Sequence, residues 1–225
     1  MRKVAFFGGT FDPVHLGHLT PAVRASETFG FDALVFVPTG QPPHKQGEPL
    51  TPFAHRFAMV ALATQAHDAF LVSAVEADRP GPTYTFDTLC RLKEAFPAGR
   101  HYFLMGSDSF AQIGTWHRWS ELPDLVRLVV LHRPTVWGDE LAASAPAELR
   151  PRLRAVRGAA DAADEGDRPN PIYLLEHEPF PIAASGLRDR VRSGLPIGEW
   201  VPPEVGRYVA KHGLYLGERG GADGR

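Results

Sequence analysis

The stretch that decides the fold is KVAFFGGTFDPVHLGHL, from Lys3 to Leu19. Its first part, residues 3–7, is a mostly apolar run, as expected of a strand buried on both faces of a sheet. A Gly-Gly pair, a polar turn and a helical pattern over residues 16–29 follow directly. This order predicts the first βα unit of a parallel sheet, in which backbone N–H groups at the helix start face the turn.

The remainder of the chain repeats this alternation. Further mostly apolar runs predict strands at residues 33–37, 70–75, 102–105, 128–131 and 172–175, and helical patterns cover residues 52–66 and 86–96. For the helix over residues 52–66 we predict Thr51 as the N-cap and Pro52 in the first helical position. The alternation predicts an α/β fold, namely a Rossmann-like doubly wound parallel sheet with helices on both faces.

The domain organisation follows from length and local composition. A chain of 225 residues is long for one domain and short for two, and we predict one domain over residues 1–216. Residues 138–171 are rich in Ala, Pro, Asp and Arg and are interpreted as an insertion, in which residues 146–156 have the pattern of a solvated helix. Residues 217–225, GERGGADGR, predict a frayed, flexible tail.

Composition argues against several classes of protein. Lys and Arg number 24 against 26 Asp and Glu, and a formal net charge of −2 does not suit a surface built for nucleic acid or an anionic membrane. A single cysteine, Cys90, allows neither an intramolecular disulfide nor a thiolate-rich metal cluster, which fits the cytoplasm. No apolar stretch is long enough to predict a membrane helix. The oligomeric state stays open, a homo-oligomer included.

The turn that follows the first strand has the composition of an anion site. Gly8 and Gly9 lack Cβ atoms, so a phosphate can approach the main chain closely, and Thr10 adds a hydroxyl donor. A Gly-Gly pair after a strand is also found in simple turns, which is the plainer interpretation of these residues.

Two histidines follow at the start of the predicted helix. His15 and His18 are three residues apart, which puts both on one face of the first helical turn, and Gly17 leaves that face open. Two imidazoles beside an anion-binding turn suit the stabilisation of a charged phosphoryl transition state. A metal half-site or two surface histidines are the alternatives.

Taken together, these residues match the T-x-x-x-x-H-x-G-H signature of the nucleotidyltransferase superfamily. Over about residues 3 to 215 the chain resembles the bacterial nicotinate-nucleotide adenylyltransferase family. The matching segments are FGGTFDPVHLGHL, PPHK at residues 42–45, PTYT at 82–85, GSDSF at 106–110, Trp116, HRP at 132–134 and IAASGLRDRV at 182–191. The resemblance implies adenylyl transfer from ATP to nicotinate mononucleotide, which gives nicotinate adenine dinucleotide and pyrophosphate in NAD biosynthesis.

The resemblance also implies roles for particular residues. The catalytic residues would be His15, His18 and Lys45, a loop cation that neutralises phosphate charge. ATP and its phosphates would be bound by Gly8, Gly9, Thr10, Phe11, Ser185 and Arg188, and the mononucleotide by Tyr84, Thr85, Gly106, Asp108, Trp116 and Arg133. Mg²⁺ is expected on the substrate phosphates, without a dedicated set of protein ligands.

One motif departs from the superfamily pattern. Its phosphate motif is usually close to I-S-S-T-x-I-R, whereas residues 182–188 read IAASGLR. Ser185 and Arg188 keep a hydroxyl and a guanidinium, while two upstream hydroxyls are missing. The departure bears on the details of triphosphate contact more than on the reaction.

Several residues have a structural interpretation beside the functional one. Asp108 is placed to cap a helix as well as to accept hydrogen bonds from a ribose, and Arg56 to form an ion pair on a helix surface. Trp119 and Cys90 are assigned to packing. Two alternative functions remain: transfer to nicotinamide mononucleotide or another phosphorylated acceptor, and a non-catalytic nucleotide-binding protein on the same fold.

Overall fold

One parallel sheet forms the centre of the computed structural model, which describes residues 1–42, 50–77, 79, 81–134, 136–162, 169–178 and 180–216. Its strand order is β3-β2-β1-β4-β5-β7-β6, and every neighbouring pair is parallel. The strands are β1 (Lys3–Gly9), β2 (Ala33–Pro38), β3 (Phe70–Val72), β4 (Arg100–Gly106), β5 (Arg127–Leu131), β6 (Leu153–Val156) and β7 (Ile172–Leu175). The predicted doubly wound parallel sheet is confirmed.

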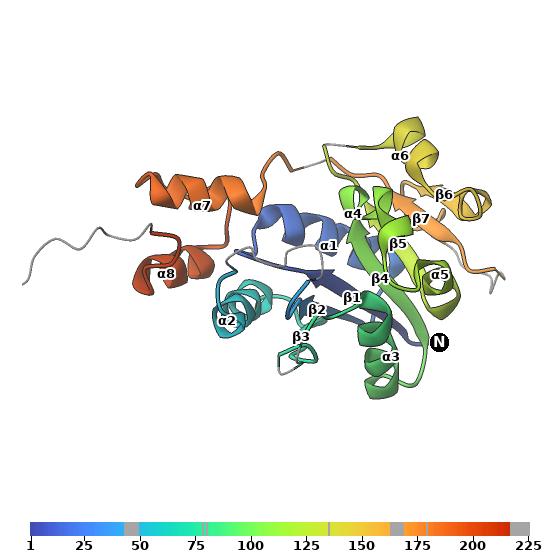
Figure 1. Ribbon diagram of the computed structural model, residues 1–225, viewed down its shortest axis with the longest axis horizontal. Helices are drawn as coiled ribbons and strands as arrows, with labels where there is room; N and C mark the ends of the chain where they lie inside the picture. Colours follow the sequence, from blue (N-terminus) through green and yellow to red (C-terminus); the bar gives the residue numbers. More distant parts are fainter. Residues whose placement is uncertain are drawn as a thin grey trace, which may run out of the picture.

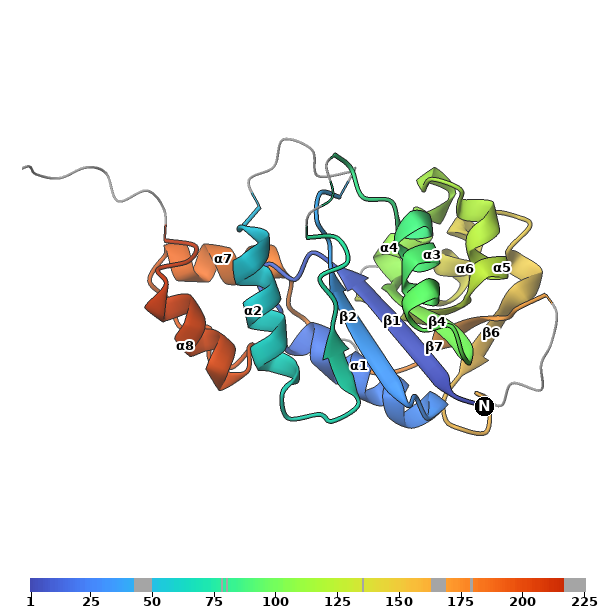
Figure 2. The same ribbon diagram turned by 90° about the horizontal axis from the view of Figure 1, so that it is seen from below.

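Helices cover both faces of this sheet, as Figures 1 and 2 show. On one face lie α1 (Leu16–Phe29), α2 (Phe53–Thr64), α7 (Ala184–Arg192) and α8 (Pro203–Lys211); on the other lie α3 (Thr85–Ala95), α4 (Ser107–Ala111), α5 (Leu122–Leu125) and α6 (Gly138–Ser144). Short 3₁₀ turns are η2 (Ile113–Thr115), η3 (Trp119–Glu121) and η4 (Arg150–Arg152). Within the described ranges, every helix is too short or too polar to cross a membrane.

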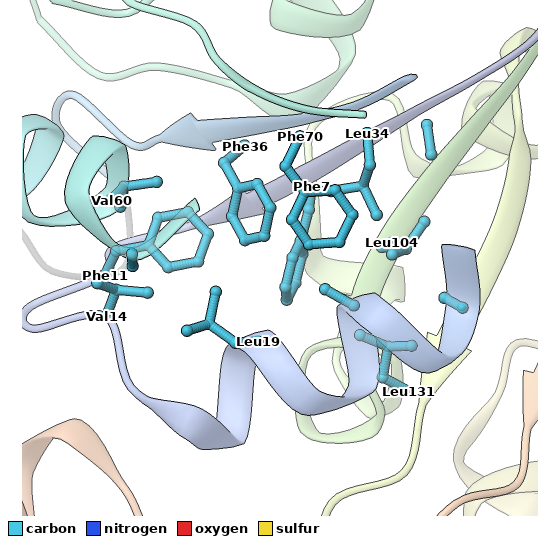
Figure 3. Close-up of a cluster of buried hydrophobic side chains, with 14 of the residues drawn as sticks. Phe7, Phe11, Val14, Leu19, Leu34, Phe36, Val60, Phe70, Leu104 and Leu131 are labelled. Atoms are coloured by element: carbon cyan, nitrogen blue, oxygen red, sulfur yellow. The ribbon is translucent and has the colours of Figure 1, made fainter. Parts of the chain in front are cut away.

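The strands alternate their side chains between two hydrophobic clusters. On β1, Phe7 faces α1 while Phe6 faces α3, and on β4 Leu104 and Phe103 divide in the same way. Figure 3 shows the cluster on the α1 face, where the rings from β1 and β2 meet Leu19 of α1. Fully burying one such side chain contributes about 1.5–3 kcal/mol, so both ends of the first βα turn rest on a rigid support.

Two predicted boundaries are wrong on the β2–α2–β3 side. The strand expected over residues 70–75 ends at Val72, after which a turn forms in which the N–H of Ala77 donates to the carbonyl of Ala74. Thr51 is not the N-cap of α2, because Pro52 occupies that position and Phe53 is the first helical residue. Thr51 instead uses its backbone in the candidate site, as described below.

The segment 138–171 also differs from its prediction. The helix expected over residues 146–156 is wrong: α6 ends at Ser144, and the chain continues through η4 into β6, which pairs with β7. Pro151 has no N–H and cannot sit within a helix interior, so the chain extends instead. Residues 163–168 of this segment and the tail 217–225 lie outside the described residues.

Candidate functional site

The first βα turn lies at the switch in strand order, because β1 has β2 on one side and β4 on the other. In open parallel sheets, ligands bind outside the carboxyl ends of the strands at such a switch. The carboxyl end of β1 leads into residues 10–15 and then into α1, which begins at Leu16. The sequence prediction of a site in this turn therefore agrees with the topology.

The two histidines of the turn lie against each other. His15 is the N-cap of α1, and its ring centroid is 3.9 Å from that of His18. The backbone N–H of His15 donates to Nδ1 of His18 over 3.4 Å. His15 is only 2% exposed, and a Cβ on Gly17 would lie 2.9 Å from its Nδ1. Gly17 therefore makes room for the His15 ring, and the prediction that it leaves the face open is wrong.

Burial keeps both imidazoles neutral. Burial, with a smaller contribution from the charge of Arg133, lowers the pKa of His15 to about 3. Burial likewise holds the pKa of His18 well below its ordinary value, with smaller contributions from His15 and Arg133. Nδ1 of His15 makes no hydrogen bond with any described part of the chain. The pair therefore presents hydrogen-bonding groups without carrying formal charge at neutral pH.

Arg133 connects this histidine pair to the end of β4. Its backbone N–H donates to Oγ of Ser107 and its Nη1 to the carbonyl of Gly17, each over 3.0 Å. A Cβ on Gly106 would collide with Oδ1 of Asp108 and lie 3.2 Å from Nε of Arg133. Burial lowers the pKa of Arg133, while the charge of Asp108 opposes that shift. The predicted Gly106, Asp108 and Arg133 are thus brought together beside the histidines.

Asp108 is not a helix N-cap. Gly106 holds the N-cap position of α4, and Asp108 is the second residue of the helix. Its Oδ1 accepts the backbone N–H of Ser109 over 2.9 Å, and the residue is exposed. The carboxylate is therefore accessible to a ligand at the carboxyl end of β4.

The glycines that begin the turn serve the core as well as the site. A Cβ on Gly8 would lie 3.1 Å from the Phe103 ring, and one on Gly9 would lie 2.9 Å from the Phe11 ring. Phe11 is buried and has a φ of 50°, in the left-handed region. Its ring belongs to the core, so the ATP contact expected of Phe11 is left to its backbone.

Two arginines hold the turn from opposite sides. Arg56 of α2 is 1% exposed and donates to the carbonyls of Thr51 and Thr10, each over 2.8 Å. Because the side chain is buried and forms no ion pair with the described residues, the interpretation of Arg56 as part of a helix-surface ion pair is wrong. Arg188 of α7 donates to the carbonyl of Asp12 over 2.8 Å, which places one end of the altered phosphate motif at the turn.

Two further phosphate ligands were predicted, Ser185 and Lys45. Ser185 is exposed in the first turn of α7, with Ala183 as the N-cap. Lys45 lies outside the described residues.

The residues expected to bind the pyridine ring form a second group. Tyr84 is the N-cap of α3 and Thr85 its first residue, and the first turn of this helix has no side-chain cap. The ring centroids of Tyr84 and His117 are 4.7 Å apart, so the chain around Trp116 reaches the start of α3. Trp116 and Trp119 are half-buried and pack on the core of this face. No described side chain caps the N–H groups at the start of α3, and such groups can donate to an anion.

A cavity of about 450 Å³ opens next to Arg133, at the carboxyl ends of β5, β6 and β7. Its lining residues are His132, Trp137, Arg157, Glu176, His177 and Glu178. The rings of His132 and Trp137 stack with centroids 4.4 Å apart. The sequence analysis did not identify this recess, because its walls come from three strands that are distant in the chain.

Sequence reasoning also missed three residues around the turn and the pyridine group: Arg56 as a support, His117 and Tyr215. Nothing in the local spacing marks them, since each is brought in by tertiary packing. The one sequence signal is the position of Arg56 in the helix predicted over residues 52–66. An arginine on the buried face of a helix requires hydrogen-bond acceptors from other parts of the chain.

Comparison with known proteins identifies relatives of this chain. Residues 6–188 match the family model described as cytidylyltransferase-like. A probable nicotinate-nucleotide adenylyltransferase of Saccharopolyspora erythraea is 40% identical over 217 residues, 96% of this chain and 91% of the relative. One of Symbiobacterium thermophilum is 40% identical over 226 residues, 100% of both chains.

A solved structure extends the similarity to the fold. The nicotinic acid mononucleotide adenylyltransferase of Plasmodium falciparum, complexed with NaAD, matches with a TM-score of 0.71 over 96% of this chain and 98% of that one. The two sequences are 20% identical, so this likeness concerns the fold alone.

Proposed function

The chain belongs to the nicotinate-nucleotide adenylyltransferase family of cytidylyltransferase-like proteins, and we propose that the turn at residues 8–18 performs the chemical step. The enzyme transfers the adenylyl group of ATP to nicotinate mononucleotide and releases pyrophosphate. The product, nicotinate adenine dinucleotide, makes this a step of NAD biosynthesis. The proposal concerns which residues bind the substrates and stabilise the reacting phosphates. The single cysteine of the sequence, Cys90, fits a cytoplasmic enzyme.

The reaction requires no nucleophile from the protein. An oxygen of the 5′-phosphate of nicotinate mononucleotide forms a bond to the α-phosphorus of ATP. The bond from that phosphorus to the oxygen bridging to the β-phosphorus breaks in line, and pyrophosphate leaves with its electron pair. Because the attacking oxygen is already anionic, the protein contributes positioning and charge stabilisation.

His18 donates a hydrogen bond to the reacting phosphates. Its Nδ1 accepts the N–H of His15, so the proton of the neutral ring is on Nε2. A neutral, preorganised donor stabilises the negative charge that moves onto the leaving pyrophosphate. His15 lies 3.9 Å away between ring centroids and acts with it, next to the cationic Arg133.

The remaining phosphate contacts surround this pair. Backbone N–H groups of Gly8, Gly9, Thr10 and Phe11, the side chains of Ser185 and Arg188, and Lys45 would hold the triphosphate. Mg²⁺, when bound, neutralises phosphate charge. Among the described residues no three His, Cys, Asp or Glu side chains are grouped to hold a metal ion, so the ion would travel on the phosphates of ATP.

The second group of residues binds the acceptor. Trp116 would stack on the pyridine ring, and the uncapped N–H groups at Tyr84 and Thr85 would receive the ring carboxylate. Gly106, Asp108 and Arg133 lie beside the histidine segment and would hold the ribose and phosphate. The observation that carries the proposal is the neutral histidine pair under Arg133 at the switch point.

A pyrophosphate-release assay tests the function. The purified chain is given ATP with nicotinate mononucleotide, nicotinamide mononucleotide or phosphopantetheine as the acceptor. We expect the highest kcat/KM with nicotinate mononucleotide. A higher value with another acceptor would identify a sister adenylyltransferase, and no release with any acceptor would identify a non-catalytic nucleotide-binding protein.

A further inference from the structure

The carboxylate of Asp12 is buried in the phosphate turn, and the reaction described above gives it no task. Asp12 is 3% exposed. Its Oδ1 accepts the hydroxyl of Tyr215 over 2.7 Å, and its Oδ2 accepts the backbone N–H of Thr51 over 3.1 Å. Both oxygens are therefore hydrogen-bonded, each to a segment distant in sequence.

Tyr215 reaches this carboxylate from the C-terminal end of the described chain. It follows α8, which packs against α2, and Figures 1 and 2 show α8 beside α2 and α7. Its φ of 66° lies in the left-handed region, which an L-residue adopts only when its surroundings hold it. Burial and the charge of Asp12 raise the pKa of Tyr215, so its hydroxyl remains a donor.

The carboxylate that Tyr215 contacts is also part of a series of hydrogen bonds around the turn. The backbone N–H of Thr51 donates to the Asp12 carboxylate, and the carbonyl of Thr51 accepts a hydrogen bond from Nε of Arg56. Arg56 also donates to the carbonyl of Thr10. Arg188 donates to the carbonyl of Asp12. The backbone at Thr10 and Asp12 is thereby bonded to α2 and α7, and the side chain of Asp12 is bonded to the segment after α8.

We propose that Tyr215 is a positioning residue for adenylyl transfer, which acts by fixing Asp12 and through it the backbone between Thr10 and His15. The inference rests on the proposed function. Removing the hydroxyl leaves one oxygen of a buried carboxylate without its donor, and the carboxylate must turn toward another partner. A displacement of the turn by a fraction of an ångström is enough to slow a reaction that depends on alignment.

The first test compares two single-hydroxyl variants. Tyr215→Phe removes the donor to Asp12, and Tyr208→Phe is the matched control, because the Tyr208 hydroxyl bonds Nδ1 of His55 and links α8 to α2 without touching the turn. We expect Y215F to lower kcat by about tenfold with KM for both substrates within about threefold, and Y208F to keep the wild-type kcat. Assays are run well below the lower melting temperature of the two variants.

The second test asks whether Tyr215 works through Asp12. Asp12→Ala, which removes both acceptor oxygens, is combined with Y215F in a double-mutant cycle on kcat. If the pathway is as proposed, the double variant is no slower than D12A, because the hydroxyl then has no carboxylate left to fix. If the effects of the two single substitutions on kcat multiply in the double variant, the proposed pathway through Asp12 is overturned.

Equal kcat for Y215F and wild type, with a lower melting temperature, would also overturn the inference and leave Tyr215 a structural residue. The same assays separate this failure from a failure of the proposed function. An inactive wild-type chain refutes the function, whereas an active wild type with an equally active Y215F refutes the inference alone.

Discussion

The phosphate side and the pyridine side of the candidate site are built differently. The phosphate side is held by hydrogen bonds from α2, α7 and Arg133, which follows β5, to the backbone of residues 10–17, and its histidines are packed ring against ring. On the pyridine side, the ring pair Tyr84–His117 and a half-buried Trp116 flank an uncapped helix start. The chemical step requires alignment, whereas acceptor choice requires only complementary groups, so rate and specificity should be separable.

The largest expected effect is on the phosphate side. His18→Ala should lower kcat by on the order of 10²-fold or more, because it removes a preorganised donor to the reacting phosphates. His18→Asn is the control for local structure, since its amide oxygen can still accept the His15 N–H. Steady-state kinetics of both variants decide the point. A near wild-type rate for H18A would make His18 an ordinary residue of the helix start.

The next effect concerns the pyridine side. We expect kcat/KM to favour nicotinate over nicotinamide mononucleotide by roughly 10²-fold, because backbone N–H donors suit a carboxylate and oppose the NH₂ of an amide. Trp116→Ala should weaken the binding of both mononucleotides to a similar extent, because the indole would stack on either pyridine ring. Kinetics with both mononucleotides measure this, and comparable efficiencies would describe a dual-specificity enzyme.

A smaller effect is expected from Lys45. Lys45→Ala should reduce kcat by about tenfold, the cost of one hydrogen bond from a cation to a phosphate. The melting temperature should not change. Kinetics and thermal unfolding are measured on the same preparation, and a shift in melting without a kinetic effect would give Lys45 a structural role.

The smallest effect is on stability, and it follows from the burial of His15. The pKa of His15 is lowered from 6.5 to about 3 in the folded chain. Between these two pH values the unfolded chain binds a proton at His15 and the folded chain does not. The free energy of unfolding therefore falls as pH decreases, by about 1 kcal/mol from this group at pH 5.5. Denaturant titrations of His15→Gln should show a weaker pH dependence than those of wild type.

The difference between the two sides also explains what could be predicted from sequence. The strand at β7 and the helix at α1 agree with their predictions at every boundary, because apolar runs and helical periodicity are local signals. The histidine pair was found for the same reason. The supports of the turn were not found, since Arg56 and Tyr215 act through contacts that only the folded chain creates.

Local signals also misled in identifiable places. Thr51 has the residue type of an N-cap, but its N–H and carbonyl are used by Asp12 and Arg56 instead. The Ala- and Arg-rich stretch before β7 resembles a solvated helix, yet Pro151 and the open edge of the sheet favour strand β6. In both cases a tertiary partner decided the outcome.

The acceptor preference of H18A tests the central claim most directly. The measurement is the ratio of kcat/KM for nicotinate over nicotinamide mononucleotide, in wild type and in H18A. If the phosphate side sets the rate and the pyridine side sets the choice, the ratio stays within about threefold of wild type while both efficiencies fall on the order of 10²-fold. A ratio that collapses toward one together with the rate would contradict the separation of the two sides.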